Sequence, residues 1–324
     1  MKMGLTSEMA HVCRILLHCV LITGCIVEAF DPMSAVNWIG QKLQYETCDD
    51  GWIRFDSSKL EQALNKKLFG QHIASPLVLK TVTGYMNNPN PKKPLVLSLH
   101  GWSGTAKNFV GQMIAESIYH KGLESKFVHV LSATKHFPHQ NHLETYIDWL
   151  QKRVESSVRK CPHSLFIFDE MDKIQAGLID SIKPCLDYHN NLDGVSYRKA
   201  IFLFLSNSGG ERINEEALDF WNKGRDREEI QLEDLEAKVS LWIFNTKGAF
   251  WHASFMDEHL VDAYVPFLPL EFKHVVQCVL AEMESRGIEP DQNVADRMAQ
   301  AMTHGRIYAT QGCKTISNRL EFYL

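Results

Sequence analysis

One short segment, HGWSGTAKNFV at residues 100–110, constrains the fold of this chain more than any other feature. It resembles the pattern G-x-x-x-x-G-K-[ST], in which the backbone amides of a tight turn hold phosphate, a lysine reaches the outer phosphates and a hydroxyl binds Mg²⁺. Lys107 is in place, but Ala106 replaces the last glycine and Asn108 replaces the hydroxyl residue. We therefore predict a phosphate-binding loop made of Gly101, Trp102, Ser103, Gly104, Thr105, Ala106, Lys107 and Asn108.

The sequence on both sides of this segment has the order that such a loop requires, with a buried strand before it and a helix after it. Residues 95–99 (LVLSL) form a short apolar run that follows the proline-rich stretch NNPNPKKP. From 107 to 121, apolar residues recur at helical spacing. The context therefore favours a true phosphate site over a chance match.

Two further apolar runs end in polar side chains that suit a nucleotide site. LFIFDE at 165–170 runs into two carboxylates. In a parallel-sheet ATPase the first acid binds Mg²⁺ and the second polarises the attacking water, and we assign these roles to Asp169 and Glu170. The run IFLFL at 201–205 leads to Asn207, which could orient that water beside the γ-phosphate. Each feature alone is typical of an ordinary turn, but their order along the chain favours ATP and Mg²⁺ as ligands.

Strands that alternate with helices predict an α/β domain with a parallel sheet and a nucleotide at the carboxyl edge of that sheet. After VPFLPL at 265–270 the pattern becomes helical, which predicts a small C-terminal helical domain over the nucleotide. We expect strands at 95–99, 127–133, 165–168 and 201–205, and helices at 59–69, 71–86, 107–121, 141–160, 176–186, 214–223, 227–240, 271–286 and 291–303. The expected domains are a signal peptide at 1–29, an N-terminal segment at 30–58, the α/β ATP-binding domain at 59–265 and the helical domain at 266–324.

The N-terminus indicates secretion. ILLHCVLITGCIV at 15–27 has the length of a signal-peptide core and is too short to span a bilayer. We expect cleavage after Ala29 and a mature protein in the secretory lumen; an uncleaved anchor or a buried helix is the alternative. The formal net charge of −5 gives no electrostatic argument for a nucleic-acid partner.

Cysteines are sparse in the mature chain, and their spacing is not that of a metal site. We expect at most one disulfide or redox pair among them. They are Cys48, Cys161, Cys185, Cys278 and Cys313.

Several segments together resemble the torsin family. The resemblance runs from about residue 59 to the C-terminus and implies an AAA+ ATPase of the endoplasmic reticulum lumen and perinuclear space. The segments are KKPLVLSLHGWSGTAKNFV, HFPH at 136–139, SLFIFDEMDKIQAGLIDSIKPCLDY at 164–188, VSYRKAIFLFLSNSGGERIN, VPFLPLE and the closing GCKT at 312–315.

The resemblance also implies roles for individual residues. Torsins carry asparagine at the position of Asn108, which therefore belongs beside the metal with Asp169. The Gly-Cys-Lys sensor segment of the family places Lys314 near the γ-phosphate and pairs Cys313 with Cys278.

Partners are implied by the resemblance as well. Torsins lack an arginine finger of their own and take one from the luminal domains of membrane-anchored activators of the inner nuclear membrane and reticulum. Accordingly, we interpret Arg225 and Arg227 as residues of a charged, solvated helix. The resemblance allows homo- or hetero-oligomers and peripheral contact with a membrane.

Ala106 is the main departure from the family, which has glycine there. Alanine costs little if its torsions are ordinary, and about 1 kcal/mol or more if φ is positive. Two functions therefore stay open: an activator-dependent ATPase, and a nucleotide-dependent scaffold that does not hydrolyse ATP. A soluble small-molecule kinase fits less well, because of the signal sequence and the LFIFDE strand.

Two other features have simple interpretations. Trp102 could stack on a base or pack against the helical domain. His136, His139 and His142 are spaced by three, but Pro138 interrupts the helix that would align them, so we do not expect zinc there.

Overall fold

The computed structural model describes residues 45–245, 260–303 and 306–324. The expected signal peptide at 1–29 lies outside the described residues, as does the following segment up to residue 44. The chain divides into two units, Met1–Glu46 and Thr47–Leu324, and the second unit carries all of the predicted site residues. None of the helices in the described part of the chain is both long and apolar enough to cross a bilayer.

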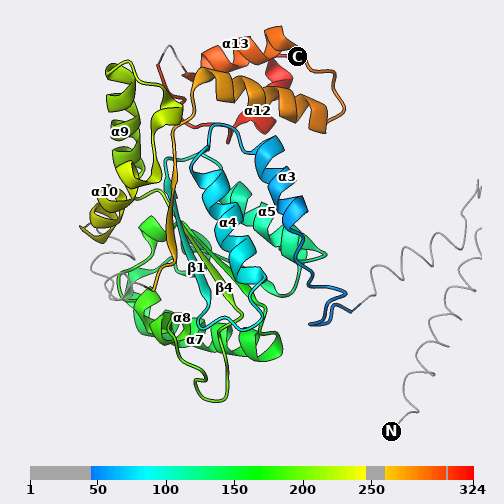
Figure 1. Ribbon diagram of the computed structural model, residues 1–324, viewed down its shortest axis with the longest axis vertical. Coiled ribbons are helices and arrows are strands. Elements are labelled where there is room, and N and C mark those ends of the chain that lie inside the picture. Colours follow the sequence, from blue (N-terminus) through cyan, green and yellow to red (C-terminus); the bar gives the residue numbers. More distant parts are fainter. Residues whose placement is uncertain (1–44, 246–259, 304–305) are drawn as a thin grey trace, which may run out of the picture. The chain divides into compact units, whose positions relative to one another are not determined.

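A five-stranded parallel sheet forms the centre of the second unit, with the strand order β2-β3-β4-β1-β5 (Figure 1). The predicted α/β fold with a parallel sheet is thereby confirmed. The fifth strand was not predicted, and the expected domain boundary after residue 265 falls inside it. The strands are β1 (Leu95–Gly101), β2 (Val128–Ser132), β3 (Leu165–Asp169), β4 (Ile201–Ser206) and β5 (Ala263–Phe267).

Helices cover both faces of the sheet because its strands are apolar on both sides. In the described residues, the helices of this domain are α3 (Ser57–Lys67), α4 (Ala74–Met86), α5 (Lys107–Ile118), α6 (Ala133–His136), α7 (Leu143–Lys160), α8 (Lys183–Leu186), α9 (Gly210–Asn222) and α10 (Leu232–Asn245), with short 3-10 turns at η1 (Gly122–Glu124), η2 (Gln140–His142), η3 (Met171–Lys173), η4 (Ile179–Ile182) and η5 (Arg227–Glu229). In β1, Leu95, Leu97 and Leu99 belong to the hydrophobic cluster shared with α3, α4 and α5, whereas Val96 belongs to the cluster shared with α7 to α10.

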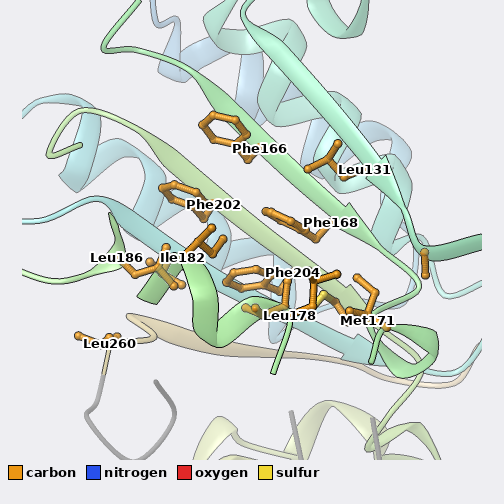
Figure 2. Close-up of a cluster of buried hydrophobic side chains, with 14 of the residues drawn as sticks. Leu131, Phe166, Phe168, Met171, Leu178, Ile182, Leu186, Phe202, Phe204 and Leu260 are labelled. Carbon is orange, nitrogen blue, oxygen red and sulfur yellow. The ribbon is translucent and has the colours of Figure 1, made fainter. Parts of the chain in front are cut away.

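Four phenylalanines align neighbouring strands on one face of the sheet. Phe166 stacks on Phe202 with ring centroids 5.0 Å apart, and Phe168 lies 5.2 Å from Phe204 (Figure 2). Such pairs contribute about 0.5–1.5 kcal/mol each beyond their buried area. Because Phe168 directly precedes Asp169, this packing fixes the strand end that carries the first candidate acid.

One predicted helix is shorter than expected, and another begins five residues later than expected. The region 176–186 contains only the turn η4 and the four-residue helix α8, and the region 227–240 begins with the separate turn η5 before α10 starts. A proline at the start of α8 and the capping box of Asp226 and Glu229 around η5 account for these breaks.

The C-terminal helical domain is also confirmed. It contains α12 (Phe272–Ser285), α13 (Gln292–Thr303), α14 (Ile316–Arg319) and the turn η6 (Leu320–Phe322), which share a hydrophobic core. A disulfide joins Cys278 of α12 to Cys313, which is the pairing that the resemblance implies.

The expectation of at most one disulfide is wrong, because a second one joins Cys48 to Cys161. These two cysteines are 113 residues apart, so only the folded chain brings them together. Cys161 caps the end of α7 and is fully buried. Cys185 has a free thiol and packs, partly buried, against the phenylalanine cluster.

Candidate functional site

A cavity of about 1100 Å³ lies where the predicted phosphate loop, the ends of β3 and β4 and the C-terminal helical domain meet. Several residues that the sequence marks as candidates line this cavity. They are Ser103, Gly104, Ala106, Lys107, Asn108, Asp169, Glu170, Asn207 and Lys314, and the Cys278–Cys313 disulfide also lines it.

The loop has the geometry of an anion site. It connects β1 to α5, and no side chain caps the N-terminus of α5. Helix N-termini with free amides favour phosphate. At Gly104 a Cβ would lie 1.7 Å from the Gln311 carbonyl oxygen, and the Cys313 amide donates to the Gly104 oxygen at 3.2 Å. The loop therefore touches the Gly-Cys-Lys segment backbone to backbone, which only glycine permits.

The backbone of Ala106 has a positive φ, a point that the sequence left open. Its φ of 81° and ψ of 17° are left-handed, in a position directly before α5. An L-residue there costs about 1–2 kcal/mol relative to right-handed backbone. The side chain packs against the cluster beneath α5. The loop thus has a backbone conformation at position 106 that suits glycine, and it accommodates alanine at a modest cost in conformational free energy.

Lys107 lies at the base of the loop with only 6% of its surface exposed. Its ammonium donates to the carbonyl oxygens of Gly101 at 2.7 Å and Trp102 at 2.9 Å, and to Asn207 Oδ1 at 3.1 Å. Burial lowers the pKa of Lys107 to about 8, although the nearby carboxylates of Asp172 and Asp169 oppose this shift. Phosphate oxygens could replace these carbonyl partners, so the desolvated ammonium of Lys107 suits the phosphates of a nucleotide.

Asn108 and Asp169 meet at the edge of the sheet. The Asn108 amide donates to Asp169 Oδ2 at 2.6 Å, and Asp169 Oδ1 accepts from the Glu170 amide at 2.8 Å. Mg²⁺ is commonly held by one or two such oxygen ligands together with phosphate and water. The pair therefore fits the metal role that the sequence assigns to it.

Glu170 is tightly held in a left-handed conformation, with φ of 60°. Its Oε2 accepts from the hydroxyls of Ser132 at 3.0 Å and Thr134 at 2.6 Å, while its Oε1 pairs with the Lys173 ammonium. Burial raises the pKa of Glu170, but the bonds from Lys173, Thr134 and Ser132 outweigh burial and lower it to about 2. In this arrangement the carboxylate is a weak base, and its lone pairs are occupied.

Asn207 bridges the loop and a residue that sequence reasoning missed. Besides accepting from Lys107, its backbone amide and side-chain amide donate to Asp172 at 3.0 and 3.4 Å. Ser206 also donates to Asp172 at 3.4 Å. The signal that could have identified Asp172 is its place in DEMD, two residues beyond Glu170, where a short turn returns it to the strand ends.

Trp102 contacts the C-terminal segment. Its indole Nε1 donates to the Thr310 carbonyl at 3.0 Å, and 42% of the residue is exposed. With Asn207 and Lys314 it lines a second cavity of about 500 Å³. Of the two interpretations left open for Trp102, the structure shows the contact with the C-terminal part of the chain.

The interpretation of Arg227 as a residue of a solvated helix is wrong. Only 7% of this residue is exposed, and its guanidinium donates to the carbonyl oxygens of Pro269 at 2.6 Å and Gly70 at 2.5 Å. Burial lowers its pKa. Arg225 is exposed and forms an ion pair with Glu229 at 3.0 Å. Arg227 is the first residue of the separate turn η5 and lies outside α10, so the helix expected over 227–240 does not include it.

The three histidines near β2 contact other rings. His136 stacks on Trp149 with ring centroids 6.0 Å apart, and the rings of His139 and His142 are tilted to each other with centroids 5.5 Å apart. Within 45–245, 260–303 and 306–324, no group of three or more His, Cys, Asp or Glu side chains is placed to hold a metal by itself.

Two family models match this chain. Residues 42–168 match the family model Torsin, and residues 270–323 match the model of the Torsin-1A C-terminal domain, so that together the matches cover more than half of the chain.

Solved structures show the same fold. The S. cerevisiae Hsp104-ADP complex is similar with a TM-score of 0.58 at 17% identity, over 90% of this chain and 50% of that one. A closed state of Hsp104 with ATPγS and FITC casein gives a TM-score of 0.57 at 16% identity, over 82% and 46%. This chain thus spans about half the length of those chains. The fold is AAA+-like with a C-terminal helical domain, and the chain belongs to the torsin family.

Proposed function

We propose that this protein binds ATP and Mg²⁺ in the large cavity and hydrolyses ATP when a membrane-anchored activator contributes an arginine. The observation that carries the proposal is the meeting of Lys107, Asn108, Asp169 and Glu170 at one end of the cavity, beside an uncapped helix N-terminus. Membership of the torsin family, whose members are generally ATPases, supports it.

The shape and lining of the cavity suit a nucleotide. Its volume of about 1100 Å³ is slightly above the range of typical ligand sites, which leaves room for a whole nucleotide. Phe69, Leu270 and Ile316 line it with apolar surface that suits a base, while Lys107 supplies charge for phosphates. Ligand sites commonly combine apolar walls with a few placed polar groups in this way.

Binding would require Lys107 to exchange its bonds with the Gly101 and Trp102 carbonyls for bonds to phosphate oxygens. Asn108 and Asp169 would hold Mg²⁺, which supplies charge neutralisation at the phosphates when bound. Asn207 and Lys314 both line the two cavities and would report the γ-phosphate.

Glu170 would orient the attacking water. To do so its carboxylate must leave the donors of Lys173 and Thr134, because a general base needs free lone pairs and a pKa nearer the working pH. We therefore expect low turnover in the isolated chain.

An external arginine is the remaining element of the proposal. Among the described residues, the cations that line the cavity are all lysines: Lys66, Lys67, Lys107, Lys173 and Lys314. An arginine from a partner typically increases phosphoryl transfer by about 10³–10⁵-fold. We propose that luminal domains of transmembrane activators of the nuclear envelope and endoplasmic reticulum supply it, in protein remodelling and membrane organisation there. The two disulfides support an oxidising lumen as the location.

The test is phosphate release by the purified luminal chain with and without an activator's luminal domain. We expect stimulated release that Glu170→Gln abolishes while ATP binding persists, and that Glu144→Gln, on the exposed start of α7, leaves unchanged. A wild-type chain that binds ATP but never releases phosphate would contradict the proposal.

The second candidate is a nucleotide-dependent scaffold without turnover. The left-handed alanine at position 106 favours it, because Ala106 lines the cavity at a position whose backbone conformation suits glycine. Turnover that appears only in Ala106→Gly would identify the wild-type chain as such a scaffold.

A further inference from the structure

His100 is a fully buried polar residue that the proposed chemistry leaves without a role. It lies in β1, directly before Gly101 and the phosphate loop, and none of its surface is exposed. Its Nδ1 is 3.0 Å from the Ser208 carbonyl oxygen, and its Nε2 is 2.6 Å from the Ser98 hydroxyl. A polar side chain this deeply buried is retained only where its hydrogen bonds are made.

These two contacts define the form of the ring. A carbonyl oxygen only accepts, so Nδ1 carries the proton and donates to Ser208, and Nε2 accepts from the Ser98 hydroxyl. Burial, together with the nearby charge of Lys107, lowers the pKa of His100 to about 3, which keeps the ring neutral at physiological pH. The imidazole is therefore a fixed link and not a proton carrier.

The link reaches the turn that carries Asn207. Ser208 follows Asn207 between β4 and α9, and Asp172 holds the other side of this turn through the Asn207 amide. The turn also packs closely on the loop, since a Cβ at Gly210 would lie 2.7 Å from the Trp102 backbone nitrogen. His100 thus connects the start of the loop at Gly101 to Ser208, which directly follows Asn207, the candidate γ-phosphate sensor.

We propose that His100 is a positioning residue, which holds Asn207 in register with Lys107 through the Nδ1 bond to Ser208. The inference rests on the proposed ATPase function and deepens it. Misplacement of a positioned group by about 1 Å can cost on the order of a hundredfold in rate. Loss of the Nδ1 donor should therefore lower the turnover number more than it lowers ATP affinity.

Two amide variants separate the contacts of the ring. His100→Asn retains a donor near the position of Nδ1, whereas His100→Gln moves the amide to the position of Nε2. Both variants are polar and uncharged, so they differ mainly in whether the bond to Ser208 survives. Melting temperature, ATP affinity and activator-stimulated kcat are measured for each variant and for wild type.

We expect His100→Gln to lower stimulated kcat by about tenfold or more, with ATP Kd changed by less than about threefold. His100→Asn should keep kcat within about threefold of wild type. In an Asn207→Ala background, His100→Gln should cost less than about twofold, because coupled residues are not additive.

Equal loss of kcat in both variants, or a full further loss in the Asn207→Ala background, would overturn the inference. If His100→Gln does not fold, His100→Asn decides alone: retained kcat supports the role, and lost kcat overturns it. A wild-type chain without stimulated release fails at the first control, which rejects the proposed function and the inference with it. If wild type shows stimulated phosphate release and His100→Gln has the same stimulated kcat, only the inference is rejected.

Discussion

Replacing Ala106 with glycine separates backbone strain from obstruction of the nucleotide. Ala106 has φ of 81° and ψ of 17°, where an L-residue costs about 1–2 kcal/mol. Glycine removes that cost but adds about 0.4–1 kcal/mol of conformational entropy to the unfolded chain. The net effect on the free energy of unfolding is a gain of roughly 0.5–1 kcal/mol, or about 1–4 °C in melting temperature for a domain of this size.

The effect on ATP should be smaller than the effect on stability. The alanine already adopts the left-handed form, and its side chain packs against the cluster beneath α5. The same strain is then present with and without ligand, so it cancels in the binding free energy. We expect ATP Kd and stimulated turnover of Ala106→Gly within about threefold of wild type.

Ala115→Gly is the matched control. Ala115 lies inside α5, the helix that Ala106 directly precedes; it is fully buried, and its φ is not positive. Glycine there should destabilise the protein by about 1 kcal/mol or more. The two substitutions remove the same methyl group and should change the melting temperature in opposite directions, as measured by calorimetry or dye-based melting. A fall in both melting temperatures, or a gain of more than about tenfold in ATP affinity for Ala106→Gly, would refute the reasoning.

Three further predictions concern charged side chains. Lys107 loses its proton as pH rises through its pKa of about 8, so ATP Kd should rise by up to about tenfold between pH 7.5 and 9; calorimetric titration checks this, and a flat profile would exclude Lys107 as the phosphate cation. The lowered pKa of Glu170 stabilises the fold above its ordinary value of 4.5, and this contribution is lost as pH falls toward about 2. Lys173→Met should therefore be less stable than wild type by under about 1 kcal/mol at neutral pH, with the gap closing in acid; denaturation curves that show a pH-independent gap would contradict the ion pair. Arg227→Met leaves the Pro269 and Gly70 carbonyls without their donor and should cost about 3 kcal/mol, whereas Arg225→Met should cost under about 1 kcal/mol; equal losses in urea denaturation would refute the difference in burial.

Much of the fold could be predicted because buried parallel strands are nearly continuous apolar runs. LVLSL, LFIFD and IFLFL stand out for that reason. Strand β5 does not, because Pro266 and Pro269 signal a break. Among the described strands β5 is at the edge of the sheet and pairs with β1 alone, so it tolerates Pro266, whose missing amide need not leave a gap in the sheet.

The residue types of the candidate site could also be predicted, but not their hydrogen-bond partners. Left-handed backbone at Ala106 depends on how the loop closes between β1 and α5, which no local pattern reports. The bonds of Asp172 to Asn207 join different strand ends through a turn that is only three residues long. The bridge between Cys48 and Cys161 likewise requires the packed sheet, since 113 residues separate its ends.

The most direct measurement is a structure of Glu170→Gln, without turnover, bound to ATP and Mg²⁺. We expect the base against Phe69, Leu270 and Ile316, and the phosphates on the loop with Lys107 turned away from the Gly101 carbonyl. A nucleotide bound elsewhere, or an empty cavity at millimolar ATP, would contradict the assignment of this cavity as the ATP site.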